Sequence, residues 1–374
     1  MKILHTVQGY YPYVGGSEEV VKKISEKLAE RGHDVTVFTS FHSDRKFNEL
    51  NGVTVRQFRV RGNSTRGIQG EADRYLNSVK SNSFDIMMNY AAQTWSTDIL
   101  LPHLKEIKGA KVFAPCGYSG LNLEKYRPYF QKLHSYLRDY DCMIYHSDIY
   151  QDKAYGDQHG LYKYEIIPNF ADEKEFNKFR RCFRKKYGIS ARLICLTVSN
   201  HFRGKGHSFV IDAFLKSNVK NAVLIIIGNP QSPLNIVTNC YYSCKIRSLL
   251  NRKRIKILSK VPRRDVIAAY HEADIFLFGS KVECSPLVLF ESMASKTPWM
   301  STKVGNVEEI PGGIIVDSVT DMANQLRKWE ADKTLRESIG MKGFDSWRDH
   351  FTLEAVVNKY EALYIRIVKE RSGK

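Results

Sequence analysis

The chain has 374 residues, of which 43% are hydrophobic and 26% are charged. This composition is that of a globular protein and excludes a disordered chain, and the length favours two domains. Lys and Arg number 57 against 40 Asp and Glu, and the resulting net charge of +17 favours polyanionic partners such as nucleic acid, anionic lipid or phosphorylated small molecules.

Neither a secretory signal nor a membrane-spanning run is visible in the sequence. Residues 1–7 are apolar over too short a stretch for a signal, and no run approaches the roughly 18 apolar residues of a spanning helix.

The seven cysteines are scattered and odd in number, which indicates reduced thiols and a cytoplasmic protein. Cys240 and Cys244 form a C-x3-C pair, and because no second pair lies nearby we do not expect zinc there.

The first part of the chain alternates short apolar runs with amphipathic ones, which is typical of strand–helix–strand units around a parallel sheet. After a strand at residues 2–7, a helix is expected to begin at Ser17 as N-cap and to stop at Gly32. Its first turn carries Glu18 and Glu19, which offset the helix dipole. Further strands are expected at residues 35–38, 86–89, 112–115 and 142–146.

The pattern breaks near residues 166–169, and the following stretch is polar and basic. We therefore expect a first domain at residues 1–169 and a second at 170–352, with an amphipathic helix over residues 353–368 at the end. The basic residues of the junction are Lys178, Arg180, Arg181, Arg184, Lys185 and Lys186. In the second domain, strands are expected at 193–198, 223–227, 255–258, 275–278 and 314–316, and helices at 208–216, 264–270, 286–295 and 321–328.

The fold class predicted from this order is α/β, with two doubly wound domains. Ligands of open α/β sheets bind at the carboxyl ends of the strands, so two such domains would face one another across a ligand-binding cleft.

The most informative segment runs from Glu283 to Glu291. Ser285 is a good N-cap and Pro286 suits a first helical position, so a helix is expected to begin there with the amides of Leu287 and Val288 free to bind phosphate. Glu291 is embedded among apolar residues, where a carboxylate is costly unless something such as a ribose hydroxyl hydrogen-bonds to it. A helix capped only for stability is the alternative interpretation.

Two further loops follow predicted strands. Between residues 199 and 207, Arg203 and Lys205 stand beside Gly204 and Gly206, which suits a phosphate cradle but also an ordinary solvated loop. Gly15 and Gly16 follow the first strand without the G-x-G-x-x-G spacing of a dinucleotide fold, and they permit either a close ligand or a plain turn.

Together these features resemble the retaining glycosyltransferases of family 4, which have the GT-B fold. The landmarks are the E-x7-E of Glu283 and Glu291, Lys205-Gly206, Gly15-Gly16, the junction at residues 167–169, residues 304–310 and the last helix. The resemblance covers nearly the whole chain. It implies two Rossmann-like domains, a nucleotide-diphosphate sugar held by the second, and a hydroxyl acceptor on the first, which the helix at residues 353–374 completes.

By this resemblance, Glu291 binds the donor ribose and Glu283 the hydroxyls of the transferred sugar. Lys205, with Arg203 and the amides after Ser285, neutralises the diphosphate, so no metal and no other cofactor is expected in the donor site. The acceptor would be a polysaccharide, a lipid-linked sugar or another glycan.

The sequence departs from the family at two positions that bear on chemistry. Asn200 stands where the family usually has Arg, which removes one cation from the donor site. Cys116 stands where a His usually lies near the reacting carbon, and Cys116 would then only line the pocket.

Other interpretations stay open at this point. Asp139-Tyr140-Asp141 could be the D-x-D motif of a metal-dependent transferase, and the departure at Cys116 suits a catalytically silent GT-B protein. A nucleic-acid binder would explain the basic cluster Arg252, Lys253, Arg254, Lys256, Lys260, Arg263 and Arg264, but no recognition module accompanies it. The same charge suits a peripheral contact with the cytoplasmic face of a membrane, for which the amphipathic residues 125–138 are a candidate unless that face is buried.

Overall fold

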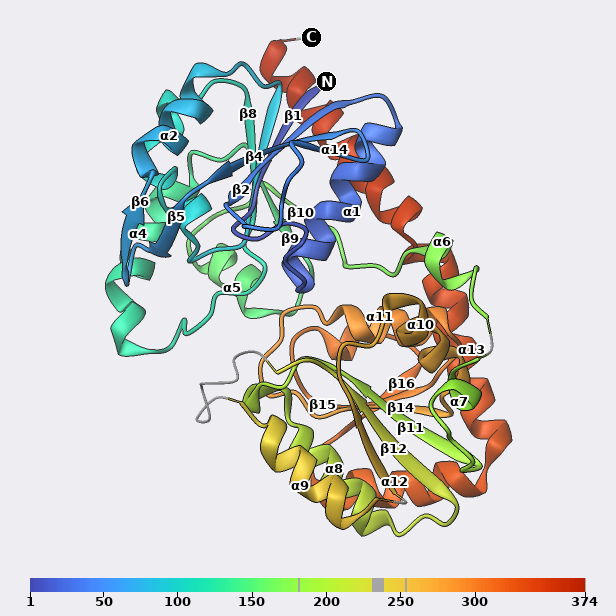
Figure 1. Cartoon of the computed structure of the whole chain (residues 1–374). Helices are drawn as coiled ribbons and strands as arrows, with labels where there is room; N and C mark the ends of the chain where they lie inside the picture. Colours follow the sequence, from blue (N-terminus) through green and yellow to red (C-terminus); the bar gives the residue numbers. More distant parts are fainter. Residues whose placement is uncertain (181, 231–238, 253, 374) are drawn as a thin grey trace. The chain divides into compact units, whose positions relative to one another are not determined.

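A computed structural model describes residues 1–180, 182–230, 239–252 and 254–373. Arg181 and Lys253 of the predicted basic clusters lie outside these residues. The chain forms two compact units, one made of Met1–Pro168 with Leu353–Lys374 and the other of Asn169–Thr352 (Figure 1). The boundary expected after residue 169 falls one residue from this division.

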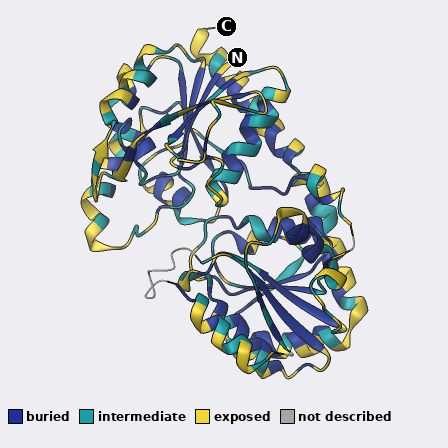
Figure 2. Ribbon diagram, in the orientation of Figure 1, coloured by how far each residue is buried: buried dark blue, intermediate teal, exposed yellow. Residues whose placement is uncertain are grey.

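The N-terminal unit is built on a sheet of strand order β10-β9-β8-β7-β1-β2-β4-β3, parallel throughout its described pairs except for β3 with β4. Helices cover both faces, so its central strands β1, β7 and β8 are buried apart from Lys2 at the start of β1 (Figure 2). The strands are β1 (Lys2–Thr6), β2 (Asp34–Ser40), β3 (Glu49–Leu50), β4 (Val53–Phe58), β7 (Ile86–Tyr90), β8 (Ala110–Ala114), β9 (Cys142–Tyr145) and β10 (Tyr164–Ile166), with a hairpin of β5 (Val60–Asn63) and β6 (Gly67–Gly70).

The last helix of the chain belongs to this unit. His5 on β1 is fully buried, and its Nε2 lies 3.1 Å from the hydroxyl of Tyr364 on that helix. At the solvent edge, Arg31 forms ion pairs with Glu354 and Glu361. The helices of the unit are α1 (Gly16–Glu30), α2 (Ala72–Ser81), α3 (Trp95–Asp98), η1 (Leu101–Glu106), η2 (Glu124–Tyr126), α4 (Arg127–Leu137), α5 (Gln151–Gln158) and α14 (Leu353–Ser372).

The C-terminal unit has a fully parallel sheet of strand order β13-β12-β11-β14-β15-β16. The chain winds outward from β11 in one direction and from β14 in the other, so the winding reverses between these two neighbouring strands. The strands are β11 (Leu193–Val198), β12 (Ala222–Ile227), β13 (Ile255–Leu258), β14 (Ile275–Phe278), β15 (Trp299–Thr302) and β16 (Gly313–Val316).

Helices cover both faces of this sheet, and each face has its own apolar cluster. The helices are α6 (Glu173–Phe176), α7 (Phe183–Lys186), η3 (Arg203–Lys205), α8 (His207–Ser217), α9 (Tyr241–Leu250), α10 (Arg263–Glu272), α11 (Leu287–Ala294), η4 (Val307–Glu309), α12 (Val319–Ala331) and α13 (Lys333–His350). In the described part of the chain, no helix is long and apolar enough to cross a bilayer.

The structure corrects the expected start of the first helix. Ser17 is not the N-cap of α1, because Gly15 occupies that position and the Ser17 hydroxyl donates to Glu18 Oε2 at 3.0 Å. The polar stretch 171–186 at the expected junction contains the short helices α6 and α7, and Phe176 and Phe183 are buried in the second unit.

The structure decides between the two interpretations of residues 125–138, a membrane contact or a buried helix. Phe130, Leu133 and Leu137 on α4 are buried in the core of the N-terminal unit. The apolar face of this helix is therefore used for packing, and only its basic side remains exposed, at Lys125, Arg127, Lys132 and Arg138.

Candidate active site

The predicted site residues of the C-terminal unit gather at the carboxyl ends of β11 and β14. Lys205 lies in η3, which follows β11, and Glu283 lies in the loop between β14 and α11. These neighbouring strands are the point where the winding of the sheet reverses. Such a switch point is where open α/β sheets bind ligands, because the loops leaving its two strands diverge and leave a crevice.

Lys205 and Glu283 are in direct contact. Lys205 Nζ lies 2.7 Å from Glu283 Oε1, and the Ser280 hydroxyl donates to the same oxygen at 2.7 Å. The side chain of Glu283 is 13% exposed and that of Lys205 is 31% exposed. A cation is thus held beside an anion at a half-buried position that still opens to solvent.

Backbone contacts hold the two loops against each other. Lys281 donates its amide to the carbonyl of Gly204 at 2.8 Å, and the Ser280 hydroxyl reaches the same carbonyl at 3.2 Å. Gly206 has φ +64°, and a Cβ there would lie 1.6 Å from the carbonyl oxygen of Gly279. Only glycine allows this approach, and the approach brings Lys205 to Glu283.

Helix α11 begins one residue later than the Ser285 cap predicts. The carbonyl of Ser285 accepts from Asn169 Nδ2 at 2.8 Å, and the first helical carbonyl is that of Pro286, which accepts from Leu289 N at 3.1 Å. Pro286 is therefore the N-cap rather than the first helical residue, and it has extended backbone angles. Leu287 and Val288 remain the first two helical residues, whose amides have no acceptor within a helix.

Two polar oxygens beside this helix end are buried without a hydrogen-bond partner among the described residues. They are Ser285 Oγ and Asn169 Oδ1. Buried polar atoms are normally paired, so these two are available to a ligand at the N-terminus of α11.

Glu291 is buried as expected, with 9% of the residue exposed. Its partner is a residue that the sequence analysis did not connect with it: Arg263 Nη1 lies 2.7 Å from Glu291 Oε1. Arg263 also contacts Glu175 Oε2 through Nε at 2.9 Å. The buried carboxylate thus has a charged partner within the protein, and the assignment of Glu291 to the donor ribose stays a prediction.

The other predicted donor residues of this unit are exposed. Asn200 Oδ1 accepts from the amide of Asn229 at 3.2 Å, which turns the side chain toward the loop after β12. Arg203 is exposed in η3, within the same short loop as Lys205. The role of Arg203 as a replacement for the missing cation at Asn200 stays a prediction.

In the N-terminal unit, the predicted residues lie at the carboxyl ends of β1 and β8. Gly15 is the N-cap of α1 and lies against the side chain of Glu18. A Cβ added at Gly15 would lie 2.3 Å from Glu18 Oε2, whereas a Cβ added at Gly16 would meet open space. Their assignment to the donor stays a prediction.

Cys116 has a left-handed backbone with φ +53°. The amides of the next two residues, Gly117 and Tyr118, donate to the buried carboxylate of Asp152 at 2.7 and 2.8 Å. Burial raises the pKa of Asp152 to about 6, although both backbone bonds act to lower it. Asp152 thus fixes the loop that carries Cys116, although it lies about 35 residues away in the sequence with no local signal for this role.

The aspartates of the D-x-D alternative lie away from the carboxyl ends of the sheet, and Asp141 has a structural role in this fold. Asp141 accepts from the amide of Lys111 at 2.7 Å and pairs with Arg371 at 3.0 Å, so it joins β8 to α14. Asp139 precedes β9 at the amino-end edge of the sheet, away from the carboxyl ends.

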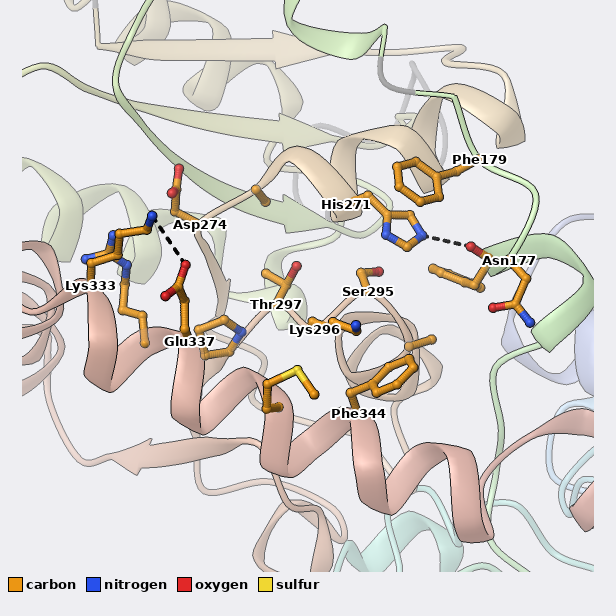
Figure 3. Close-up of a pocket in the computed structure, with 16 residues that line it drawn as sticks. Asn177, Phe179, His271, Asp274, Ser295, Lys296, Thr297, Lys333, Glu337 and Phe344 are labelled. Atoms are coloured by element: carbon orange, nitrogen blue, oxygen red, sulfur yellow. Dashed lines mark hydrogen bonds and ion pairs between the residues drawn. The ribbon is translucent and has the colours of Figure 1, made fainter.

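A cavity of about 700 Å³ lies elsewhere in the C-terminal unit (Figure 3). Its wall includes Asp274 and Pro298, the residues that immediately precede β14 and β15. In Figure 3, Lys333 and Glu337 project into it from α13, while His271 stacks on Phe179 with ring centroids 3.5 Å apart. The cavity is thus at the amino-end edge, opposite to Lys205 and Glu283.

Cys240 and Cys244 have no second cysteine pair near them in the sequence, but in the fold two histidines lie beside them. Ligand atoms of His201, His207, Cys240 and Cys244 all lie within 4.8 Å of one another, and all four residues are buried. The two histidines are about 40 residues earlier in the chain, so a search for a second cysteine pair does not find them.

Two family models match the chain, one on each part. The model described as Glycosyltransferase Family 4 matches residues 14–175, and the model described as Glycosyl transferases group 1 matches residues 179–345. The chain is 25% identical to N-acetyl-alpha-D-glucosaminyl L-malate synthase of Bacillus anthracis over 393 aligned residues, which cover 97% of each protein.

Solved structures of glycosyltransferases have the same fold. Sucrose-phosphate synthase from Thermosynechococcus elongatus matches with a TM-score of 0.78 at 17% identity, over 98% of both chains. HepE of Anabaena, solved in complex with UDP, matches with a TM-score of 0.78 at 16% identity, over 97% of this chain and 99% of that one. With two Rossmann-like units and both halves matched, the chain belongs to the group 1, family 4-like glycosyltransferases of the GT-B fold.

Proposed function

We propose that the chain transfers a sugar from a nucleotide-diphosphate sugar to a hydroxyl acceptor with retention of configuration. The observation that carries the proposal is the contact between Lys205 and Glu283 at the switch point of the second sheet, beside the N-terminus of α11. A cation, a carboxylate and free helix amides in one place are the groups that a sugar diphosphate requires.

In this proposal, the diphosphate binds between Lys205 and the first turn of α11. Lys205 supplies a full positive charge, and the amides of Leu287 and Val288 supply the positive end of the helix dipole. The Ser285 hydroxyl, which lacks a partner among the described residues, donates to the same anion. Arg203 reaches the diphosphate from the exposed side of the loop.

The two glutamates take the neutral parts of the donor. Glu283 accepts hydrogen bonds from hydroxyls of the transferred sugar, and Glu291 accepts from the ribose. Arg263 contacts Glu291 and is a positioning residue, because its ion pair compensates the charge of the buried carboxylate and fixes its direction.

The reaction breaks the bond between the sugar C1 and the diphosphate oxygen. Negative charge then grows on the leaving nucleoside diphosphate, while the acceptor hydroxyl bonds to C1 and passes its proton to the departing diphosphate oxygen. Fixed positive groups aimed at the leaving oxygen stabilise this transition state, and they need no reorganisation when the charge appears. Since Lys205 and the α11 amides supply that charge, we propose that the donor site works without a metal ion.

We assign the acceptor to the N-terminal unit and retention to the mechanism, both on the family resemblance. The acceptor class is a polysaccharide, a lipid-linked sugar or another glycan, and Cys116 lines the pocket near the reacting carbon. For a lipid-linked acceptor, the net charge of +17 supports a purely electrostatic contact with anionic lipid at the cytoplasmic face, since the apolar side of α4 is buried.

The experiment that tests the proposal is a thermal-shift screen of UDP-, GDP-, ADP- and dTDP-sugars, followed by turnover assays with those that stabilise the protein. A true donor raises Tm in proportion to the logarithm of its concentration over Kd. No stabilisation by any of them would contradict the proposal. Stabilisation without transfer or hydrolysis would favour the catalytically silent alternative.

A further inference from the structure

We infer that His201, His207, Cys240 and Cys244 bind one Zn²⁺ ion in the C-terminal unit. Two sulfur and two nitrogen ligands at tetrahedral spacing form a set that zinc prefers among the metals of proteins. The four residues come from two places in the chain, the loop and start of helix after β11 and the beginning of α9.

The distances within the cluster suit a tetrahedral ion. In a site with Zn–S near 2.3 Å and Zn–N near 2.0 Å, sulfur and nitrogen ligands are roughly 3.5 Å apart. Cys240 Sγ lies 3.2 Å from His207 Nδ1 and 3.7 Å from His201 Nδ1. No ligand pair exceeds 4.8 Å, so small side-chain rotations bring all four atoms onto one ion.

The contacts around the two rings also support metal binding. His207 directs Nδ1 at Cys240 and holds Ser199 Oγ with Nε2 at 2.7 Å, which is the arrangement of a ligating histidine whose other nitrogen is fixed by an outer partner. His201 is fully buried, and its Nδ1 is directed at the same Cys240 Sγ. The two rings therefore present their Nδ1 atoms to one thiol, as two ligands of a shared ion would.

The spacing in the sequence agrees with the geometry. The histidines form H-x5-H and the cysteines C-x3-C, both within the spacings found in structural zinc sites, although here the histidine pair comes first. Cys240 is the N-cap residue of α9 and Cys244 lies one turn later, so both thiols point from the same side of that helix. With four protein ligands, the site is closed and structural rather than catalytic.

The position of the cluster assigns the ion a role. His201 and His207 stand at the two ends of the loop 202–206 that carries Lys205, and the cysteines connect both ends to α9. Helices α8 and α9 lie side by side in Figure 1 and are joined by an ion pair between Asp212 and Arg247. Zinc would therefore fix the loop of the proposed diphosphate site, but its binding does not depend on that function.

The test is the zinc content of the full-length protein, purified under reducing conditions with any affinity tag removed, then incubated with excess Zn²⁺ and desalted. Mass spectrometry of the metal should find about one zinc per chain, since four ligands fill one coordination sphere. Cys244→Ala and His207→Ala should lose the zinc, whereas Cys182→Ser, which removes an exposed thiol of the same unit, should keep it.

A second measurement needs no variant and holds if these substitutions prevent folding. Replacement of zinc by Co²⁺ in the wild-type protein should produce thiolate-to-cobalt charge-transfer bands and the intense visible bands of a tetrahedral site. The inference is overturned if wild-type protein retains no zinc and shows no cobalt bands, if the cluster variants fold and retain as much zinc as the wild type, or if Cys240 and Cys244 form a disulfide under the reducing purification. None of these readouts uses glycosyl transfer, so the inference can fail while the proposed function stands.

Discussion

Lys205 is the residue on which the proposed chemistry depends most, and Lys205→Ala tests it. The change removes the ammonium that lies 2.7 Å from Glu283 Oε1 and leaves that carboxylate with Ser280 as its described partner. A hydrogen bond to a charged group contributes about 1.5–3 kcal/mol, so the Kd for the nucleoside diphosphate should rise roughly 10- to 150-fold. The loss in kcat should be about 100- to 1000-fold, as for other groups that stabilise developing charge.

Glu283→Gln tests the charge of Glu283 at the same contact without changing the shape of its side chain. It keeps the size of the side chain but removes the anion that neutralises Lys205, so the nucleoside diphosphate should bind as tightly as before or more tightly. Turnover should still fall, because Glu283 is assigned to the hydroxyls of the transferred sugar. The two variants therefore change nucleotide affinity in different directions while both reduce kcat.

The assays are calorimetry with the nucleoside diphosphate of the donor found by thermal shift, and initial rates with its sugar. Lys333→Ala is the matched control, because it removes the same charge from an exposed side chain of the same unit at the opposite edge of the sheet. Thermal melting of each variant verifies the fold. The reasoning fails if Lys205→Ala keeps its nucleotide affinity and most of its kcat, or if both variants weaken nucleotide binding equally.

Three further predictions test other parts of the molecule. Glu291→Ala should weaken binding of the nucleoside diphosphate by about 10- to 100-fold in calorimetry, through a lost hydrogen bond to the ribose, and unchanged affinity would refute the ribose assignment. Burial lowers the pKa of His5 to about 3 from an ordinary value of 6.5, so the unfolded chain takes up a proton that the folded unit excludes. Stability should therefore fall as pH drops below 6.5, by about 2 kcal/mol at pH 5, and hydrogen exchange of the β1 amides should show this loss in the wild type but not in a stable His5→Gln variant. Pelleting with anionic vesicles should fall steeply with added salt, and salt-insensitive pelleting, or none, would reject the electrostatic membrane contact.

The strands of the second unit were predictable because they are buried on both faces. Residues 193–198 and 275–278 are short apolar runs rich in Leu, Ile and Phe, and the structure has β11 and β14 at those bounds. β15 was missed because Trp299–Thr302 is half polar, and its Ser and Thr point their hydroxyls at backbone carbonyls rather than at solvent. Local composition does not distinguish such a strand from a loop.

The candidate site was predictable only in part, for a different reason. Lys205, Glu283 and Glu291 lie next to strand ends or helix starts, and those positions carry local signals such as glycine, proline and capping residues. Arg263 lies at the start of α10, in a cluster of basic residues where nothing in the sequence distinguishes it from the other cations. Its ion pair with Glu291 exists because α10 and α11 pack together. The start of α11 was misplaced because the carbonyl of Ser285 bonds to Asn169, a residue 116 positions away.

The proposed zinc site gives a second possible cause for any requirement for metal in this enzyme. A chelator that removes a divalent ion from the donor diphosphate would abolish transfer at once, and Mg²⁺ or Mn²⁺ would restore it. A chelator that removes zinc from His201, His207, Cys240 and Cys244 would instead release the loop of Lys205. Activity would then decline at the rate of zinc release together with Tm, and only Zn²⁺ or Co²⁺ would restore it. Loss of activity in a chelator is thus compatible with a metal-free donor site. The time course of the loss and the identity of the ion that restores activity distinguish a metal at the donor diphosphate from zinc at the His/Cys cluster.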